Sequence, residues 1–136
     1  MITCSDFRFK SVERTFAEAG KLANDYDLIA RPGGIRSLAS PRNEAARASM
    51  EEELLMLWTL HAFARVLMLN HVSCRAYDDL VTREGERDVH TSHLLAAGAV
   101  IERRCPGVTA EPYLIALIDG ALRVEAVEPP ESGSVS

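Results

Sequence analysis

The sequence has 136 residues, of which 47% are hydrophobic and 26% are charged, which is the ordinary balance of a globular protein with one core. Its formal net charge of -5 argues against nucleic acid as a partner, since nucleic-acid-binding domains usually carry a basic face. No apolar run reaches the roughly 20 residues that a membrane helix needs, so we expect no membrane partner.

The N-terminus and the cysteines predict a cytoplasmic protein. The chain does not begin with a basic region followed by an apolar core, so no secretory signal is expected. Three cysteines are an odd number and do not make a disulfide framework in such a chain. In a reducing compartment, cysteines are expected to be ligands, nucleophiles or core residues.

The first third of the chain predicts two strands separated by a helix. Residues 1–4 are typical of a short strand, and apolar residues at helical spacing predict a helix over 12–26. A second strand is expected at 28–30. The Arg-Pro-Gly-Gly segment at 31–34 can continue neither a strand nor a helix, so it predicts a loop.

A long helix and a buried strand are expected in the middle of the chain. Ser40 and Pro41 are typical of an N-cap and a first helical position, and the helix they begin is expected to end near Phe63. The run Val-Leu-Met-Leu at 66–69 is continuously apolar, which favours a strand buried on both faces. The segment 71–74 follows this strand, and a short helix is expected after it.

The last third predicts a helix, a hairpin and a tail. The helix is expected around 92–104, and the hairpin strands at 113–118 and 121–127 flank Asp-Gly, a strong two-residue turn signal. Residues 128–136 have the composition of a disordered tail.

This order of elements predicts an α/β fold, in which a small, mostly parallel β-sheet is flanked by helices and carries a C-terminal antiparallel hairpin. Residues 1–127 are expected to form its single domain. In parallel sheets, sites form beyond the carboxyl ends of the strands. Cys4, the loop 31–34 and the segment 71–74 each follow a predicted strand, so we expect them to meet at one edge of the sheet.

Three of the residues at that edge are good zinc ligands. Cys4, His71 and Cys74 supply two thiolates and one imidazole. Three protein ligands leave a coordination position free for water, which is the catalytic arrangement. His-x-x-Cys alone is weak evidence, because buried cysteine is usually a small apolar residue. Cys4 at the end of another strand strengthens the hypothesis.

The context of these ligands resembles the β-class carbonic anhydrases over nearly the whole chain. The specific segments are Thr-Cys-Ser-Asp-Phe-Arg at 3–8 and Asn-His-Val-Ser-Cys at 70–74. The segment 26–34 is similar to the second strand and loop of the family, but more loosely. The chain resembles a short member that lacks the N-terminal helical arm of the family, which typically wraps the partner subunit. The resemblance implies the β-carbonic-anhydrase fold and a homodimer or higher homo-oligomer.

The resemblance also implies an enzyme, a carbonate dehydratase that reversibly hydrates carbon dioxide to bicarbonate and a proton. It implies a zinc ion on Cys4, His71 and Cys74, with a paired Asp6 and Arg8 beside it. Zinc lowers the pKa of its water, and two thiolates make that water less acidic than three histidines do. Asp6 would accept a hydrogen bond from the resulting hydroxide, and Arg8 would keep Asp6 ionised and away from the metal.

The chain departs from the pattern of the family in its flanking residues. The family usually has glycine on both sides of His-x-x-Cys, where this chain has Asn70 and Arg75. The loop that contains Gly33 and Gly34 replaces the usual Asn-Ala loop. Gly33, Gly34 and Arg75 are therefore candidates for the substrate pocket, and Arg75 is expected either to bind an anion or to obstruct the pocket.

The remaining marked residues favour structural interpretations. His61 is expected to be a packed core histidine and Cys105 a helix-end residue, while His90 and His93 are expected to cap a helix or face solvent, with proton shuttling as an alternative for one of them.

Two other functions remain open from the sequence. Relatives with the same ligands hydrolyse carbonyl sulfide or carbon disulfide. A non-catalytic, zinc-containing protein that binds an anion or a partner is supported by Arg75 and the altered loop. A free fourth zinc position separates the enzyme from the binding protein.

Overall fold

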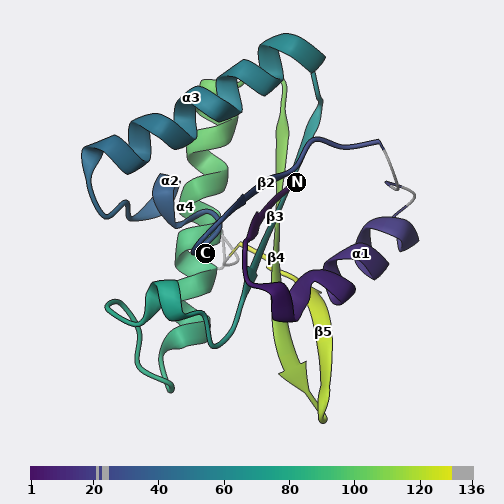
Figure 1. Cartoon of the computed structure of the whole chain (residues 1–136), viewed down its shortest axis with the longest axis vertical. Helices are drawn as coiled ribbons and strands as arrows, with labels where there is room; N and C mark the ends of the chain where they lie inside the picture. The colour runs from purple at the N-terminus through teal and green to yellow at the C-terminus, as the bar shows by residue number, and fades with distance from the viewer. Residues whose placement is uncertain (21, 23–24, 130–136) are drawn as a thin grey trace, which may run out of the picture.

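The computed structural model describes residues 1–20, 22 and 25–129. Its centre is a five-stranded sheet in the order β2-β1-β3-β4-β5 (Figure 1). The strands are β1 (Ile2–Cys4), β2 (Ile29–Arg31), β3 (Arg65–His71), β4 (Thr109–Ile118) and β5 (Ala121–Ala126). The pairs β1–β2, β1–β3 and β3–β4 are parallel, and β5 pairs antiparallel with β4. The predicted α/β class, with its mostly parallel sheet and C-terminal hairpin, is confirmed.

Helices cover both faces of the sheet, with α2, α3 and α4 on one side and α1 on the other (Figure 1). The α-helices are α1 (Lys10–Ala19), α2 (Arg36–Ala39), α3 (Glu44–His61) and α4 (Glu86–Arg104), and two 3-10 turns are η1 (Phe7–Phe9) and η2 (Arg75–Tyr77). Among the described residues, no helix has the length and apolarity needed to cross a membrane.

The strand β3 separates two apolar cores because successive side chains of a strand point to opposite faces. Val66 and Met68 belong to the core beneath the three helices. Leu67 and Leu69 belong to the core under α1, with Phe9. The continuous apolar run of β3 was predicted to be buried on both faces, and this is confirmed. The same alternation continues at the end of the strand, where Asn70 and His71 are both buried.

The hairpin of β4 and β5 turns at the predicted Asp-Gly pair. Ile118 pairs with Ala121, and the two residues between them have positive φ values, 50° at Asp119 and 79° at Gly120. Both values suit a tight turn that matches the right-handed twist of the strands. The strand β4 begins at Thr109, earlier than predicted.

Two predicted helix boundaries in the first half are wrong. The helix expected over 12–26 ends at Ala19, with Gly20 as its C-cap, and Leu22 packs back against the core under α1. One residue of that pattern, Ala23, lies outside the described residues. Ser40 does not begin the long helix but ends α2, and the N-cap of α3 is Asn43, whose side chain accepts the amide hydrogen of Ala46 at 2.8 Å.

The helix α4 begins at Glu86, six residues before the predicted start. Glu86 and Asp88 lie in its first turn, where carboxylates interact favourably with the helix dipole. His90 is consequently inside the helix and fully buried, rather than a cap or a solvent-facing residue as predicted. Cys105 is the buried C-cap, as expected. Most of the predicted tail, residues 130–136, lies outside the described residues.

Candidate metal centre

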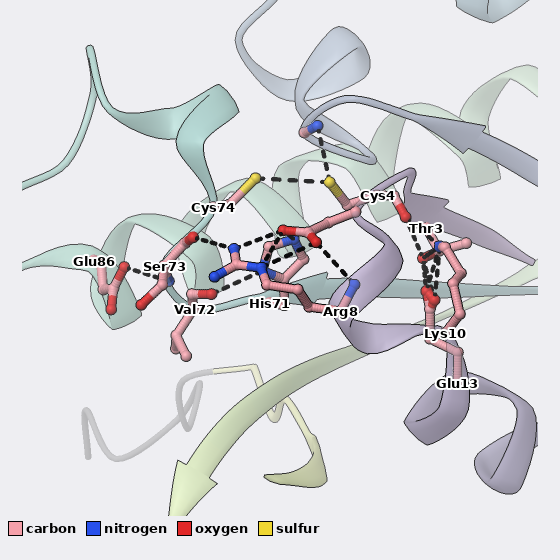
Figure 2. A network of polar contacts seen from close by, with 12 residues as sticks. Thr3, Cys4, Arg8, Lys10, Glu13, His71, Val72, Ser73, Cys74 and Glu86 are labelled. Carbon is pink, nitrogen blue, oxygen red and sulfur yellow. Dashed lines mark hydrogen bonds and ion pairs between the residues drawn. The ribbon is translucent and has the colours of Figure 1, made fainter.

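The three predicted ligands meet at the carboxyl edge of the sheet. Cys4 is the last residue of β1, His71 is the last residue of β3, and Cys74 is the N-cap of η2. Their ligand atoms all lie within 4.8 Å of one another, and all three residues are buried. The sulfur atoms of Cys4 and Cys74 are 3.8 Å apart (Figure 2). This group could hold a metal ion.

The imidazole of His71 is oriented for ligation. Its Nδ1 lies 2.7 Å from the carbonyl oxygen of Val72 and must donate, since a carbonyl oxygen only accepts. Nε2 of the neutral ring therefore carries the lone pair, and it is buried without a hydrogen-bond partner among the described residues. The ring of Phe9 stacks on the imidazole at a centroid distance of 3.9 Å, which limits its rotation. A buried acceptor without a hydrogen-bond partner suits a metal ligand.

The backbone reverses between His71 and Cys74 at a strained residue. Ser73 has a φ of 57°, in the left-handed region that non-glycine residues rarely adopt. The carboxylate of Glu86 accepts the amide hydrogen of Ser73 at 3.0 Å (Figure 2), and the carbonyl of Ser73 accepts from Arg8 at 3.1 Å. These contacts hold the turn that brings Cys74 back to the imidazole.

The contact between the two sulfur atoms shifts the pKa values of Cys4 and Cys74 in opposite directions. The hydrogen bond from Cys74 lowers the pKa of Cys4, and the amide hydrogen of Gly33 also points at the Cys4 sulfur, at 3.4 Å. The same contact with Cys4, together with burial, raises the pKa of Cys74. The centre therefore favours one thiolate, on Cys4, facing one thiol. A bound cation favours deprotonation of the second thiol as well.

Asp6 and Arg8 form the predicted pair at the mouth of the centre. The guanidinium of Arg8 donates to the Asp6 carboxylate from Nε at 3.1 Å and from a terminal nitrogen at 2.6 Å. This contact lowers the pKa of Asp6 to about 2, so the carboxylate is ionised at neutral pH. One of its oxygen atoms lies 3.8 Å from Nε2 of His71. The dyad is therefore beside the ligands.

A second buried network supports the end of β1. Thr3 donates to the carboxylate of Glu13, which is only 3% exposed, and Lys10 donates to the same carboxylate at 2.9 and 3.0 Å (Figure 2). Lys10 also donates to the carbonyl oxygen of Cys4 at 2.5 Å. The backbone of Cys4 is thus fixed to α1. Lys10, on the same helix, also supplies the positive charge that allows the Glu13 carboxylate to be buried.

The predicted pocket residues lie in different surroundings. Gly33 and Gly34 line the turn after β2 and are buried against the centre, with Gly34 close to the backbone of Cys4. Arg75 is exposed, and within the described residues no hydrogen bond or ion pair joins it to the three ligands. Gly33 and Gly34 therefore lie with the cluster, whereas Arg75 is exposed.

Three buried neighbours of the centre were not placed there by the sequence analysis. Arg36 is buried, and its guanidinium pairs with Asp79 at 2.7 Å and donates to the carbonyl oxygen of Ala76 at 2.5 Å, so it fixes η2. Tyr77 and His90 are fully buried behind the centre. For His90 a signal was available, since its spacing of four, seven and eleven residues from Leu94, Ala97 and Ile101 is that of one helix face.

A large cavity lies at the opposite end of the sheet. It has a volume of about 540 Å³ and is lined by residues at the amino ends of the strands, among them Met1, Tyr26, His61 and Phe63. His61 is exposed there and its Nδ1 lies 2.6 Å from Asp27, so the prediction of a packed core histidine is wrong. Size alone does not make this cavity the functional site, because the cluster of nucleophilic and ligating groups lies elsewhere.

The chain is similar to two rickettsial proteins whose names state no activity. An uncharacterized protein of Rickettsia bellii is 27% identical over 129 residues, which cover 90% of this chain and 77% of that protein. An uncharacterized protein of Rickettsia conorii is 26% identical over 129 residues, which cover 90% of this chain and 68% of that protein. No family model and no solved structure matches the chain. The resemblance to the β-class carbonic anhydrases stays a prediction.

Proposed function

We propose that this chain is a zinc-dependent enzyme of the β-carbonic-anhydrase type, which reversibly hydrates carbon dioxide to bicarbonate and a proton. The observation that carries the proposal is the joint presence of two features at one edge of the sheet. Cys4, His71 and Cys74 have ligand atoms within 4.8 Å of one another, and the ionised Asp6 lies 3.8 Å from Nε2 of His71.

Zinc fits this donor set. Thiolate and imidazole are its preferred ligands in proteins, and hard cations such as Mg²⁺ prefer oxygen donors instead. Nε2 of His71, which has no hydrogen-bond partner among the described residues, and the closely spaced sulfur atoms of Cys4 and Cys74 supply one nitrogen and two sulfur donor atoms for a metal. When bound, zinc would supply a water that is acidic enough to attack an electrophilic carbon near neutral pH.

The residues of the chain would then orient the reaction. Asp6 is ionised, so it would accept a hydrogen bond from the attacking oxygen and direct the lone pair of that oxygen toward the substrate carbon. Arg8 binds both carboxylate oxygens of Asp6 and the carbonyl of Ser73, which holds the carboxylate back from the metal position. The stacked ring of Phe9 covers one face of His71 and keeps that side dry.

A second candidate is a non-catalytic zinc protein that binds an anion or a partner. The proximity of Asp6 to Nε2 of His71 favours it, because a carboxylate at this distance reaches the metal when Arg8 releases it. With Asp6 as a fourth ligand, no position would be left for water, and the centre would be structural. Hydrolysis of carbonyl sulfide or carbon disulfide uses the same ligands and differs in the substrate that is admitted.

The test is stopped-flow hydration of carbon dioxide at pH 7 and pH 9, with the zinc content of the same sample measured. We expect about one zinc per chain, activity that rises with pH, and loss of activity in Asp6→Ala with zinc retained. The matched control is Asp88→Ala, which removes an exposed carboxylate from the first turn of α4. Stoichiometric zinc without hydration at either pH contradicts the proposal, and turnover of carbonyl sulfide by that sample would assign the hydrolase instead.

A further inference from the structure

The residue before His71 reaches away from the ligands and into the opposite core. Asn70 is 1% exposed, and its side chain lies on the face of β3 that the helices α2, α3 and α4 cover. The family that the chain resembles usually has glycine at this position, so the contacts of Asn70 are a feature of this chain. A buried amide requires partners, and its partners show what it holds.

Both hydrogens of the Asn70 amide are used. Nδ2 donates to the hydroxyl of Tyr77 at 3.1 Å and to Nδ1 of His90 at 3.0 Å. Nδ1 of His90 therefore accepts, and the Tyr77 hydroxyl is also hydrogen-bonded to Nδ1 of His93 at 3.2 Å. Tyr77 ends η2, and its amide hydrogen bonds the carbonyl oxygen of Cys74 at 2.9 Å. Asn70 thus ties the end of β3 to the segment that carries Cys74.

The carbonyl side of Asn70 lies against the loop after β2. A Cβ atom added to Gly34 would lie 2.8 Å from Oδ1 of Asn70 and 3.2 Å from the backbone nitrogen of Cys4. The neighbouring Gly33 donates its amide hydrogen to the sulfur of Cys4. Asn70, which precedes His71 on β3, therefore places its side chain between the turn after Cys74 and the loop that bonds Cys4.

We infer that Asn70 is a positioning residue for the metal centre, which fixes the mutual spacing of Cys4, His71 and Cys74 through Tyr77, His90 and Gly34. The inference rests on the proposed metal-binding function and adds to it. Tyr77 carries the link to Cys74, and His90 fixes the amide so that its oxygen faces the loop. Loss of Asn70 loosens the ligand triangle without removing a ligand.

The first measurement is the rate at which zinc leaves the protein in excess chelator. Outer partners of metal ligands typically contribute 10–100-fold to affinity, so we expect Asn70→Ala to release zinc about 10-fold faster. Tyr77→Phe removes one of the two acceptors of the Asn70 amide and should have a smaller effect on the rate of zinc release. The double variant should lose less than the product of the two single effects, because they break one link.

The control separates positioning from general stability. Ile101→Val removes one methyl group from the buried face of α4, well along the helix from His90. It lowers the denaturation midpoint and should leave the zinc release rate unchanged. In the cobalt-substituted protein, Asn70→Ala should shift the visible absorption bands, which report ligand geometry, and Ile101→Val should not. Equal release rates and identical spectra for Asn70→Ala and wild type would overturn the inference.

A metal-free measurement tests the positioning independently. Diamide takes up two electrons and two protons as Cys4 and Cys74 form a disulfide, and the rate reports how closely the two sulfurs are held. The sulfur atoms are 3.8 Å apart, so we expect fast closure in the metal-free wild type and slower closure in Asn70→Ala, with the disulfide identified by peptide mapping. If wild type binds no metal but shows this difference, the proposed function fails and the positioning role stands. An unchanged rate would overturn the positioning role.

Discussion

The buried His90 gives a quantitative prediction for the dependence of stability on pH. Its imidazole is fully buried, and its Nδ1 already accepts a hydrogen bond from the Asn70 amide. Burial, with smaller contributions from the nearby imidazoles of His71 and His93, lowers the pKa of His90 from 6.5 to about 4. The unfolded chain therefore binds a proton near pH 6.5 that the folded chain does not bind until about pH 4.

The sign of the effect follows from linkage. Stability rises with pH wherever the unfolded state binds more protons, so the contribution of His90 is lost as the pH falls from 6.5 to 4. A difference of about 2.5 pKa units at about 1.4 kcal/mol each gives a loss of about 3 kcal/mol between pH 7 and pH 4. This loss is a large fraction of the stability of a small domain.

The assay is urea denaturation of the metal-free protein at several pH values from 7 to 4, for wild type and His90→Gln. Glutamine retains an acceptor for Asn70 and does not titrate. We expect wild type to lose about 3 kcal/mol more than the variant over this range. The control His61→Gln removes an exposed imidazole and should follow wild type much more closely. If His90→Gln and wild type lose stability in parallel, the burial argument for His90 is refuted.

Two further predictions concern the loop after β2 and the dyad. Gly34→Ala should lower the free energy of unfolding by roughly 2–4 kcal/mol, because a Cβ would meet Asn70 and the Cys4 backbone at a φ of 57°. Gly120→Ala, with a φ of 79° and no atom within 4 Å, should lose only about 1–2 kcal/mol, and equal losses would contradict the close packing. Arg8→Met should raise the pKa of Asp6 from about 2 toward 3.8, measured by carbon NMR of the carboxyl group in metal-free protein. An unchanged titration would show that Arg8 is not the cause.

The elements with the strongest local signals were predictable from the sequence. The strand β3 has an unbroken apolar run, and the Asp-Gly turn sets the register of β4 and β5 so that Ile118 meets Ala121. The meeting of Cys4, His71 and Cys74 was also predictable, since parallel strands bring their carboxyl ends to one edge. Each of these inferences depends on topology or on turn chemistry within a few residues.

The boundaries of the helices were less predictable because neighbouring signals compete. Ser40 and Pro41 have the chemistry of a helix start, but Asn43 caps α3 with a side-chain hydrogen bond, and Ser40 ends the short α2. The apolar spacing over 12–26 continues past Gly20, where the helix α1 ends. Leu22 lies after the helix and packs against the core under α1, so it extends the apolar pattern without extending the helix.

The surroundings of the ligands could not be read from local pattern. The sequence marks Asn70 only as an unusual residue beside His71, and it does not say that Tyr77 and His90 will face it. These contacts bring together residues 7 and 20 positions away along the chain. Placing the start of α4 at residue 92 excluded His90 from the helix, so the apolar face that buries it was not recognised.

Among the described residues, the buried side-chain atoms that lack a hydrogen-bond partner all lie in or next to the candidate metal centre. Glu13 and Arg36 are buried charges, and each has several hydrogen-bond partners. In the described part of the chain, only three buried side-chain atoms have no partner, and they belong to Asn70, His71 and His90. The protein therefore provides hydrogen-bond partners for the buried charges of Glu13 and Arg36, whereas these three atoms, which lie in one region, have none. A zinc ion on His71 would satisfy Nε2 and favour deprotonation of the Cys74 thiol. It would leave the two atoms on the far face of β3 as they are, which is why Asn70 and His90 need the separate test of positioning.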